Sequence, residues 1–423
     1  MSTSSPAARA AIDEATKPAV ASWRNLVSHR AWLDAETSSL LEFARGARVE
    51  HGFGWLGDDG TVLAGRPQPL WITARFTHVF ALGALLGHPG CAPLCDHGLR
   101  ALLNDFADHK HGGWYAELQD GRPSRPDKEA YSFAFVVLAM ASASLAGRSG
   151  ARQGLASALD LVERHFWRED EGACCEAYDA AWGEPEAYRG ANANMHAVEA
   201  FLAAADALRE PLWRQRALRI CERVIDRFAR AEAWRVVEHF DAAWTPLPDY
   251  NADAPDHPFR PFGVTPGHGL EWARLLLNLR ASLDDPPAWL LEAARGLFDR
   301  AIGDGWAAPG GFVYTTDPSG APVVERRLHW VVTEAIGAAA ALHEATGEEV
   351  YEAWYRRAWD FADVHLRDRT RGSWRHELDA QLAPVEGTWS VKPDIYHAVQ
   401  ATLIPRLPLS GSLAGALRAG AAR

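Results

Sequence analysis

A repeat of about 60 residues runs through most of this 423-residue chain and constrains its fold more than any other feature. In each repeat, a short stretch rich in glycine or aromatic residues precedes a helical segment whose first turns carry polar side chains. The stretches begin about 60 residues apart, with one interval nearer 75, at residues 52–55, 112–115, 172–178, 234–240, 310–314 and 372–374. A fixed period indicates one supersecondary unit used repeatedly, so six units predict a closed ring.

Apolar residues recur with helical periodicity through most of the chain, whereas strand-like alternation is confined to the short stretches. The first helix of each pair has a charged face, and the second is small and apolar all round after its first turn. An outer and an inner ring of helices follow, so we expect an all-α (α/α)6 barrel with short β-hairpins in its connecting loops. The expected helices are residues 32–46, 72–86, 94–109, 128–146, 153–167, 192–208, 212–228, 267–282, 288–302, 328–346, 350–366 and 394–403.

The repeat has no break in composition, so we expect a single catalytic domain over residues 21–405 despite the length of the chain. Residues 1–20 are expected to be a flexible N-terminus, and residues 406–423 a peripheral C-terminal tail rich in Ala, Gly and Ser. Residues 242–266 contain six prolines and no helical period, which predicts a long ordered loop or lid.

Charge and cysteine content narrow the classes of function. The net charge of −12 gives no electrostatic footprint for nucleic acid or an anionic membrane. The uncharged run 130–147 is borderline long enough to span a membrane, but it occupies an inner-helix position and is expected to be a buried helix. Five cysteines without zinc-ribbon spacing, and a start without an apolar signal core, favour the reducing cytoplasm.

Polar side chains stand at the same point of each repeat, so a closed ring would bring them together at one pocket. His268 and Glu271 are three residues apart at a helix start, where the carboxylate can orient the imidazole as a general base. His397 holds the equivalent place in the last repeat. We therefore expect His268 and His397 to be the catalytic groups, facing each other across a central pocket.

The other helix starts supply further polar and aromatic residues for this pocket. Glu334 interrupts an apolar run, and a buried carboxylate needs a partner, which we expect to be Arg75, a histidine or a ligand hydroxyl. The full set is Arg75, Tyr131, Asn192, His196, Glu271, Trp330 and Glu334, with Asp394 opening the last helix.

Several chemistries lack their sequence signals. No His-Glu-x-x-His motif or comparable local ligand pair predicts a metal, and no Gly-rich phosphate loop or dinucleotide fingerprint predicts a cofactor. No Gly-x-Ser-x-Gly elbow predicts a serine nucleophile. We expect catalysis without metal or cofactor.

Five motifs resemble those of the N-acylglucosamine 2-epimerase superfamily, in particular its aldose–ketose isomerase branch of mannose and sulfoquinovose isomerases. They are Thr-Ala-Arg-Phe-Thr-His at 73–78, Asn-Ala-Asn-Met-His-Ala-Val-Glu at 192–199, Thr-Pro-Gly-His-Gly-Leu-Glu-Trp at 265–272, His-Trp-Val-Val-Thr-Glu at 329–334 and Lys-Pro-Asp-Ile-Tyr-His at 392–397. The resemblance spans about residues 22–405. It implies an (α/α)6 barrel that interconverts free monosaccharides without metal or nucleotide, with two acid/base histidines matching His268 and His397. It also implies that the substrate-binding residues, which contact the sugar or hold the histidines, are Arg75, Tyr131, Asn192, His196, Glu271, Trp330 and Glu334.

The resemblance favours an isomerase that interconverts D-mannose and D-fructose, and also D-lyxose and D-xylulose, through a cis-enediol. We assign the C2/C1 proton transfer to His397 and ring opening or oxygen-proton shuttling to His268, and the sequence does not fix which histidine has which of these roles. The alternatives are a mannose 2-epimerase, which needs two bases, or a sulfoquinovose isomerase. More distant are an (α/α)6 glycoside hydrolase that uses Glu271 and Glu334 as paired carboxylates, or a sugar-binding protein without activity.

Overall fold

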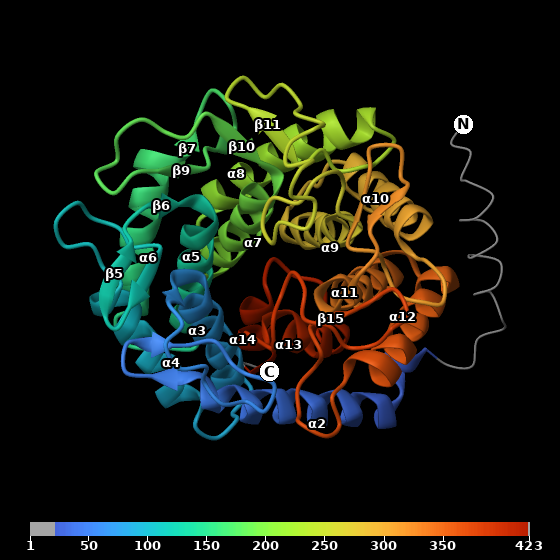
Figure 1. The fold of residues 1–423 in the computed structure, drawn as a ribbon, viewed down its shortest axis with the longest axis horizontal. Helices are drawn as coiled ribbons and strands as arrows, with labels where there is room; N and C mark the ends of the chain where they lie inside the picture. The colour runs from blue at the N-terminus through green and yellow to red at the C-terminus, as the bar shows by residue number, and fades with distance from the viewer. Residues whose placement is uncertain (1–21, 422–423) are drawn as a thin grey trace.

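The computed structural model describes residues 22–421, and its helices form two concentric rings. The inner ring consists of α3 (Leu70–Leu85), α5 (Ala130–Leu145), α7 (Ala191–Leu208), α9 (Pro266–Ser282), α11 (His329–Thr346) and α13 (Tyr396–Leu403). The outer ring consists of α2 (Val27–Ala44), α4 (Cys91–Arg100), α6 (Ala151–Leu161), α8 (Pro211–Cys221), α10 (Trp289–Gly305) and α12 (Glu349–Phe361). Figure 1 shows the ring closing where α2 meets α13, and this confirms the (α/α)6 barrel.

Short helical turns flank several of these helices. Four outer helices continue into π-helical turns, η3 (Ala101–Asp105), η4 (Val162–Phe166), η5 (Glu222–Ala229) and η6 (Ala362–Leu366). The 3-10 turns are η1 (Trp23–Asn25), η2 (Arg45–Ala47) and η7 (Ile404–Arg406). With these turns included, the expected helix ranges agree with the observed ones to within a few residues. The agreement follows because the hydrophobic pattern of each segment indicates both that it is a helix and how it is buried.

Short strands join each unit to the next. The strand before an inner helix pairs antiparallel with a strand that follows the next outer helix, as in β3–β4, β6–β9, β10–β11 and β14–β15. A bridge from Val264 to Thr316 takes the same place in a fifth unit, before α9 (Pro266–Ser282). The strands are β1 (Arg48–Val49), β2 (Gly52–Phe53), β3 (Gln68–Pro69), β4 (Glu117–Gln119), β5 (Arg122–Arg125), β6 (Lys128–Glu129), β7 (Trp167–Arg168), β8 (Ala173–Cys174), β9 (Ala177–Tyr178), β10 (Tyr188–Gly190), β11 (His239–Asp241), β12 (Thr315–Thr316), β13 (Pro322–Val324), β14 (Arg327–Leu328) and β15 (Glu377–Leu378). This pairing fixes where each inner helix begins.

Inner helices are buried on nearly every side because alanine and glycine allow close neighbours. In α11, residues 335–342 are all buried, and the helix packs against α9, α12 and α13. The uncharged run that we expected to be a buried helix is α5, which packs between α3 and α7. No helix in the described part of the chain is both long and apolar enough to cross a membrane.

We expected the segment after Pro405 to be peripheral, but it packs against the barrel. Its α14 (Leu413–Ala421) packs against α3, α5 and α7, and Ala414 is fully buried. The Ala and Gly content of this segment suggested a peripheral tail in the sequence. In the structure, these small side chains allow α14 to pack closely against the inner helices. The expected flexible N-terminus, residues 1–20, lies outside the described residues.

Ring packing depends on close approach at Gly98, where α4 meets α3. A Cβ atom there would lie 2.0 Å from Thr77 Oγ1. We predict that Gly98→Ala lowers the free energy of unfolding by about 1–3 kcal/mol, because the two helices must separate. Urea unfolding measures this effect.

The matched control is Gly269→Ala in α9, where the new Cβ would make an ordinary 3.4 Å contact with Ala301. Since alanine is the better helix former, this variant should be unchanged or more stable by up to about 1 kcal/mol. Equal stability of the Gly98→Ala protein and the wild type would contradict the packing described.

Candidate active site

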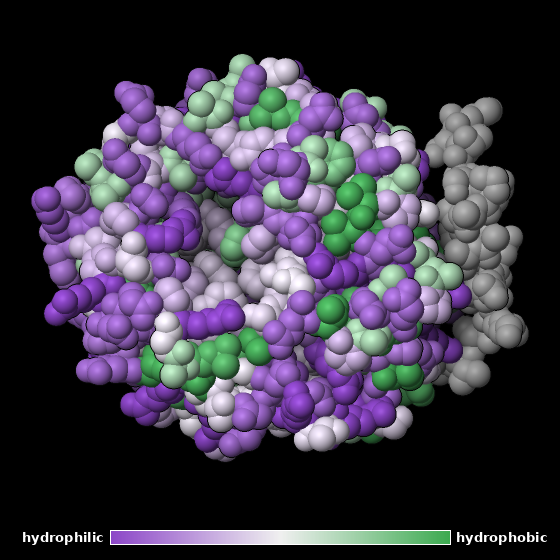
Figure 2. Space-filling view, viewed as in Figure 1, coloured by the Kyte–Doolittle hydropathy of each residue, from purple (hydrophilic) through white to green (hydrophobic). Residues whose placement is uncertain are grey.

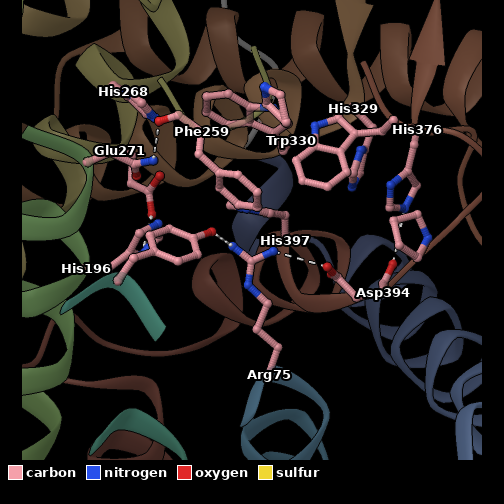
Figure 3. Close-up of a pocket in the computed structure, with 15 residues that line it drawn as sticks. Arg75, His196, Phe259, His268, Glu271, His329, Trp330, His376, Asp394 and His397 are labelled. Carbon is pink, nitrogen blue, oxygen red and sulfur yellow. Dashed lines mark hydrogen bonds and ion pairs between the residues drawn. The ribbon is translucent and has the colours of Figure 1, made fainter. Parts of the chain in front are cut away.

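A cavity lies on the barrel axis where the inner helices begin, and this face of the molecule is hollowed near its centre (Figure 2). Eight of the nine expected site residues line it, and Glu334 does not. The lining residues are Arg75, Tyr131, Asn192, His196, Pro258, Phe259, His268, Glu271, His329, Trp330, His376, Trp389, Pro393, Asp394 and His397. Figure 3 shows that they reach the cavity from elements far apart in the sequence.

His268 is held by a buried carboxylate, but not by the one we expected. Its Nδ1 lies 2.9 and 3.0 Å from the two carboxylate oxygens of Glu238. Glu271, three residues along the helix, bonds to Arg274 instead, at 3.4 Å. The expectation that Glu271 orients His268 was therefore wrong: the ring turns back toward the segment before the helix, where Glu238 also accepts a hydrogen bond from the Thr265 amide at 3.2 Å.

His397 has the same arrangement in the last repeat. Its Nδ1 lies 2.9 Å from Glu334 Oε1, and Arg274 Nε donates to Glu334 Oε2 at 3.1 Å. Burial alone would raise the pKa of Glu334, but Arg274 and His397 outweigh it and hold that pKa below the ordinary value. The expectation that Glu334 meets a histidine is confirmed, although Glu334 stands behind His397 and not at the cavity surface.

These two contacts fix the tautomers of both histidines. A carboxylate only accepts hydrogen bonds, so Nδ1 carries the proton in His268 and in His397, and Nε2 is left for a ligand. Both rings lie near the indole of Trp330, with centroids 5.4 and 5.8 Å away. Two acid/base groups from different helices thus flank one aromatic wall of the cavity.

Glu271 belongs to a buried cluster beneath the cavity. Burial, and then the neighbouring charge of Glu334, raise the pKa of Glu271 well above its ordinary value, which favours its neutral form. Burial also lowers the pKa of His196 to about 4. Nδ1 of His196 lies 3.6 Å from Glu199 and 3.9 Å from Glu271. Glu271 and His196 therefore offer uncharged hydrogen-bonding groups to a ligand.

The same cluster is a group of described residues with the geometry to hold a metal ion, since ligand atoms of His196, Glu199 and Glu271 lie within 4.8 Å of one another. Arg274 already brings a positive charge to Glu271, and the raised pKa of that carboxyl group favours a bound proton. An ion would have to displace that proton and lie beside a guanidinium group, which makes the fit poor.

Arg75 is a fixed cation, as expected. Its guanidinium donates to Asp394 at 3.1 Å and to the hydroxyl of Tyr131 at 2.8 Å. It also lies over the aromatic rings of Phe135 and Tyr396, 4.4 and 4.8 Å from their centroids. These contacts hold one charged group rigidly at the cavity wall.

The loop at residues 242–266 covers part of the cavity. Asn192 Nδ2 donates to the carbonyl of Phe259 at 3.1 Å, and the Phe259 ring lies 5.2 Å from Tyr131 and 5.5 Å from Trp389. The next residue of the loop, Arg260, forms an ion pair with Glu186 and so anchors the loop. Phe259 thus closes the cavity from above, although whether the loop moves as a lid stays a prediction.

Sequence reasoning missed several residues of the site. Glu238 lies in the expected fourth stretch, 234–240, where a carboxylate among apolar residues is the same signal that pointed to Glu334. His376 follows the last stretch, 372–374, by two residues, and His329 immediately precedes Trp330. Phe259, Pro258 and Trp389 come from loops without a period, so nothing in the sequence placed their side chains at the cavity. Pro393 lies in the motif at 392–397 but was not named as a site residue.

Comparison with known proteins agrees with the fold and the site. The family model of N-acylglucosamine 2-epimerase (GlcNAc 2-epimerase) matches residues 52–401. A protein from Thermobifida fusca named D-mannose isomerase is 53% identical over 401 residues, covering 93% of this chain and 98% of its own. Another of that name, from Pseudomonas cannabina pv. alisalensis, is 48% identical over 403 residues, covering 94% and 97%.

A solved structure supports the same relationship. The crystal structure of a D-mannose isomerase superposes with a TM-score of 0.84 at 31% identity, covering 89% of this chain and 97% of that one. Fold, motifs and family model agree over most of the chain. The protein therefore belongs to the N-acylglucosamine 2-epimerase family.

Proposed function

We propose that this protein is an aldose–ketose isomerase that interconverts D-mannose and D-fructose. The observation that carries the proposal is the pair of histidines, His268 and His397, each bound through Nδ1 to a buried glutamate and both lining one cavity. Proton transfer between neighbouring carbons needs such positioned acid/base groups. The D-mannose isomerases that are 53% and 48% identical to this chain support the choice of substrate.

The reaction begins with opening of the pyranose ring. His268 removes the proton from O1 and supplies one to the ring oxygen. His397 then takes the C2 proton through Nε2, which leaves an enediolate with its charge on O1. His268 gives a proton to O1, which completes the cis-enediol, and takes one from O2 as the C2 carbonyl forms, while His397 returns its proton to C1 on the same face. Glu334 already faces His397, so the imidazolium that forms becomes an ion pair without rearrangement.

The remaining residues hold the sugar and stabilise the intermediate. Arg75 lies at the wall as a preorganised cation for the developing enediolate oxygen. Tyr131, Asn192, His196 and Glu271 contact sugar hydroxyls, and Trp330 packs against the carbon chain. Glu334 acts through His397 and is a positioning residue, not a substrate contact.

An uncharged sugar suits this cavity best. Among the described residues that line it, Arg75 is the one group with a permanent positive charge, and Asp394 already pairs with it. A sulfonate or phosphate would find no free cation, which favours mannose over sulfoquinovose. D-Lyxose, which lacks only C6 of mannose, is an expected second substrate.

The nearest rival is a mannose 2-epimerase, because two histidines are also what proton return to the opposite face of C2 requires. Chromatography of the products from mannose separates these possibilities, since the isomerase gives fructose and the epimerase glucose. Release of shorter sugars from an oligosaccharide, with no change in mannose, would indicate a glycoside hydrolase. Mannose binding without any product would indicate a sugar-binding protein.

We also place the protein in a reducing compartment such as the cytoplasm, because its five cysteines are buried and unpaired. A monosaccharide is the one partner that the proposal requires, and it includes no nucleic acid and no membrane.

We predict that His268→Asn and His397→Asn each reduce kcat for mannose by about 10²–10⁴-fold, because each variant loses an acid/base group. Steady-state kinetics would measure this, with circular dichroism to show that the variants are folded. His165→Asn is the control, since His165 stacks on Trp182 and does not line the cavity. A folded His268 or His397 variant with near wild-type turnover would remove that residue from the mechanism.

A second prediction concerns metals. Activity should survive exhaustive chelation, because the His196 cluster already carries the positive charge of Arg274. Elemental analysis of the active protein should find no stoichiometric metal. Activity that is lost to a chelator and restored by a divalent cation would show that this interpretation of the cluster is wrong.

A further inference from the structure

Two histidines outside the proposed proton-transfer pair form one wall of the cavity. His329 is the first residue of α11, and its amide donates to the carbonyl of His376, just before β15, at 2.9 Å. Their rings stack with centroids 3.7 Å apart and planes at 29°. Figure 3 shows them beyond Trp330, on the opposite side of the view from His268 and Glu271.

His329 has unused hydrogen-bonding capacity in a buried position. His329 is only 3% exposed, yet neither of its ring nitrogens has a hydrogen-bond partner within the described residues. Three other cavity histidines differ, because His268 and His397 bind glutamates and His376 Nε2 donates to the Asp394 carbonyl at 3.1 Å. His196 also has a buried Nδ1 without a hydrogen-bond partner, but in His329 both ring nitrogens lack one. Buried polar atoms are rarely left unpaired, so a ligand or water must satisfy those of His329.

The surroundings indicate which ligand groups would fit. Burial, and then His397, lower the pKa of His329 to about 3, and burial together with His329 lowers that of His376 well below its ordinary value. Both rings are therefore neutral at neutral pH. A neutral imidazole offers one donor and one acceptor, which suits a hydroxyl group because a hydroxyl can both donate and accept.

We propose that His329 binds hydroxyl groups of the sugar through its two ring nitrogens and that His376 positions His329 by stacking against it. This inference rests on the proposed function, since it takes the ligand of the cavity to be an aldose. It adds His329, as a substrate-binding residue, to the eight expected site residues that line the cavity. The wall formed by His329 and His376 would thus bind a polyhydroxyl chain through uncharged groups.

The test replaces His329 by phenylalanine, which keeps an aromatic ring for stacking but removes both nitrogens. KM for mannose should rise about 10–100-fold, as expected for the loss of one or two neutral hydrogen bonds, and kcat should change less. The same comparison is then made with 3-deoxy-, 4-deoxy- and 6-deoxy-D-mannose. For the analogue that lacks a hydroxyl bound by His329, the ratio of variant to wild-type KM should fall toward 1. An unchanged KM for mannose, or an equal ratio for mannose and all three analogues, would overturn the proposal.

The positioning role of His376 has its own pair of variants. His376→Phe retains the stack and should keep KM for mannose within about threefold of wild type, whereas His376→Ala frees the His329 ring and should raise KM with the same dependence on the deoxy analogues. If His376→Phe raises KM as much as His376→Ala, stacking does not position His329.

Calorimetry with D-mannitol, an acyclic analogue that cannot react, separates this inference from the proposed function. Mannitol should bind the His329→Phe protein about 10-fold or more weakly than the wild type. Equal affinity would reject the role of His329 alone. A wild type that binds mannitol but does not convert mannose would reject the proposed function alone.

Discussion

The site depends on the placement of buried carboxylates behind its histidines. Glu334 and Glu238 are each almost fully buried, a position that is costly for a charge unless hydrogen bonds and an opposite charge offset it. His397 and Arg274 meet that requirement for Glu334, and His268 with a backbone amide meets it for Glu238. The carboxylates gain stability from the histidines, and the histidines gain a fixed tautomer and orientation.

One guanidinium group, that of Arg274, supports more than one carboxylate. It lies 3.1 Å from Glu334 and 3.4 Å from Glu271, at the centre of the barrel. Burial, and then the charge of Glu334, outweigh the effect of this cation on Glu271 and raise the pKa of Glu271 well above its ordinary value, which favours its neutral form. The same electrostatic arrangement thus yields an ionised group behind His397 and a neutral donor facing the cavity, without any difference in side-chain type.

The sequence predicted the site residues whose positions follow from the repeat, but it did not predict the contacts that join one repeat to another. Inner-helix starts such as Arg75 and His397 were found because each recurs at one point of the period, and the closed ring brings them together. Glu238 was missed as the partner of His268, because strand pairing that joins one unit to the next sets this contact. Phe259 was missed because a proline-rich loop has no period from which a side-chain direction can be read. The packing of α14 was missed because its content of Ala and Gly was taken as typical of a peripheral tail, although the helix is amphipathic.

The account requires that one histidine carry a proton between C2 and C1 on one face of an enediol, and NMR of mannose conversion in deuterated water tests this most directly. The early product should be fructose with deuterium at C1, and the label should be substoichiometric if the shielded histidine keeps the proton that it removed from C2. Glucose that appears as fast as fructose, with deuterium at C2, would mean that protons return to both faces. That result would contradict an isomerase and establish the two histidines as the opposed bases of an epimerase.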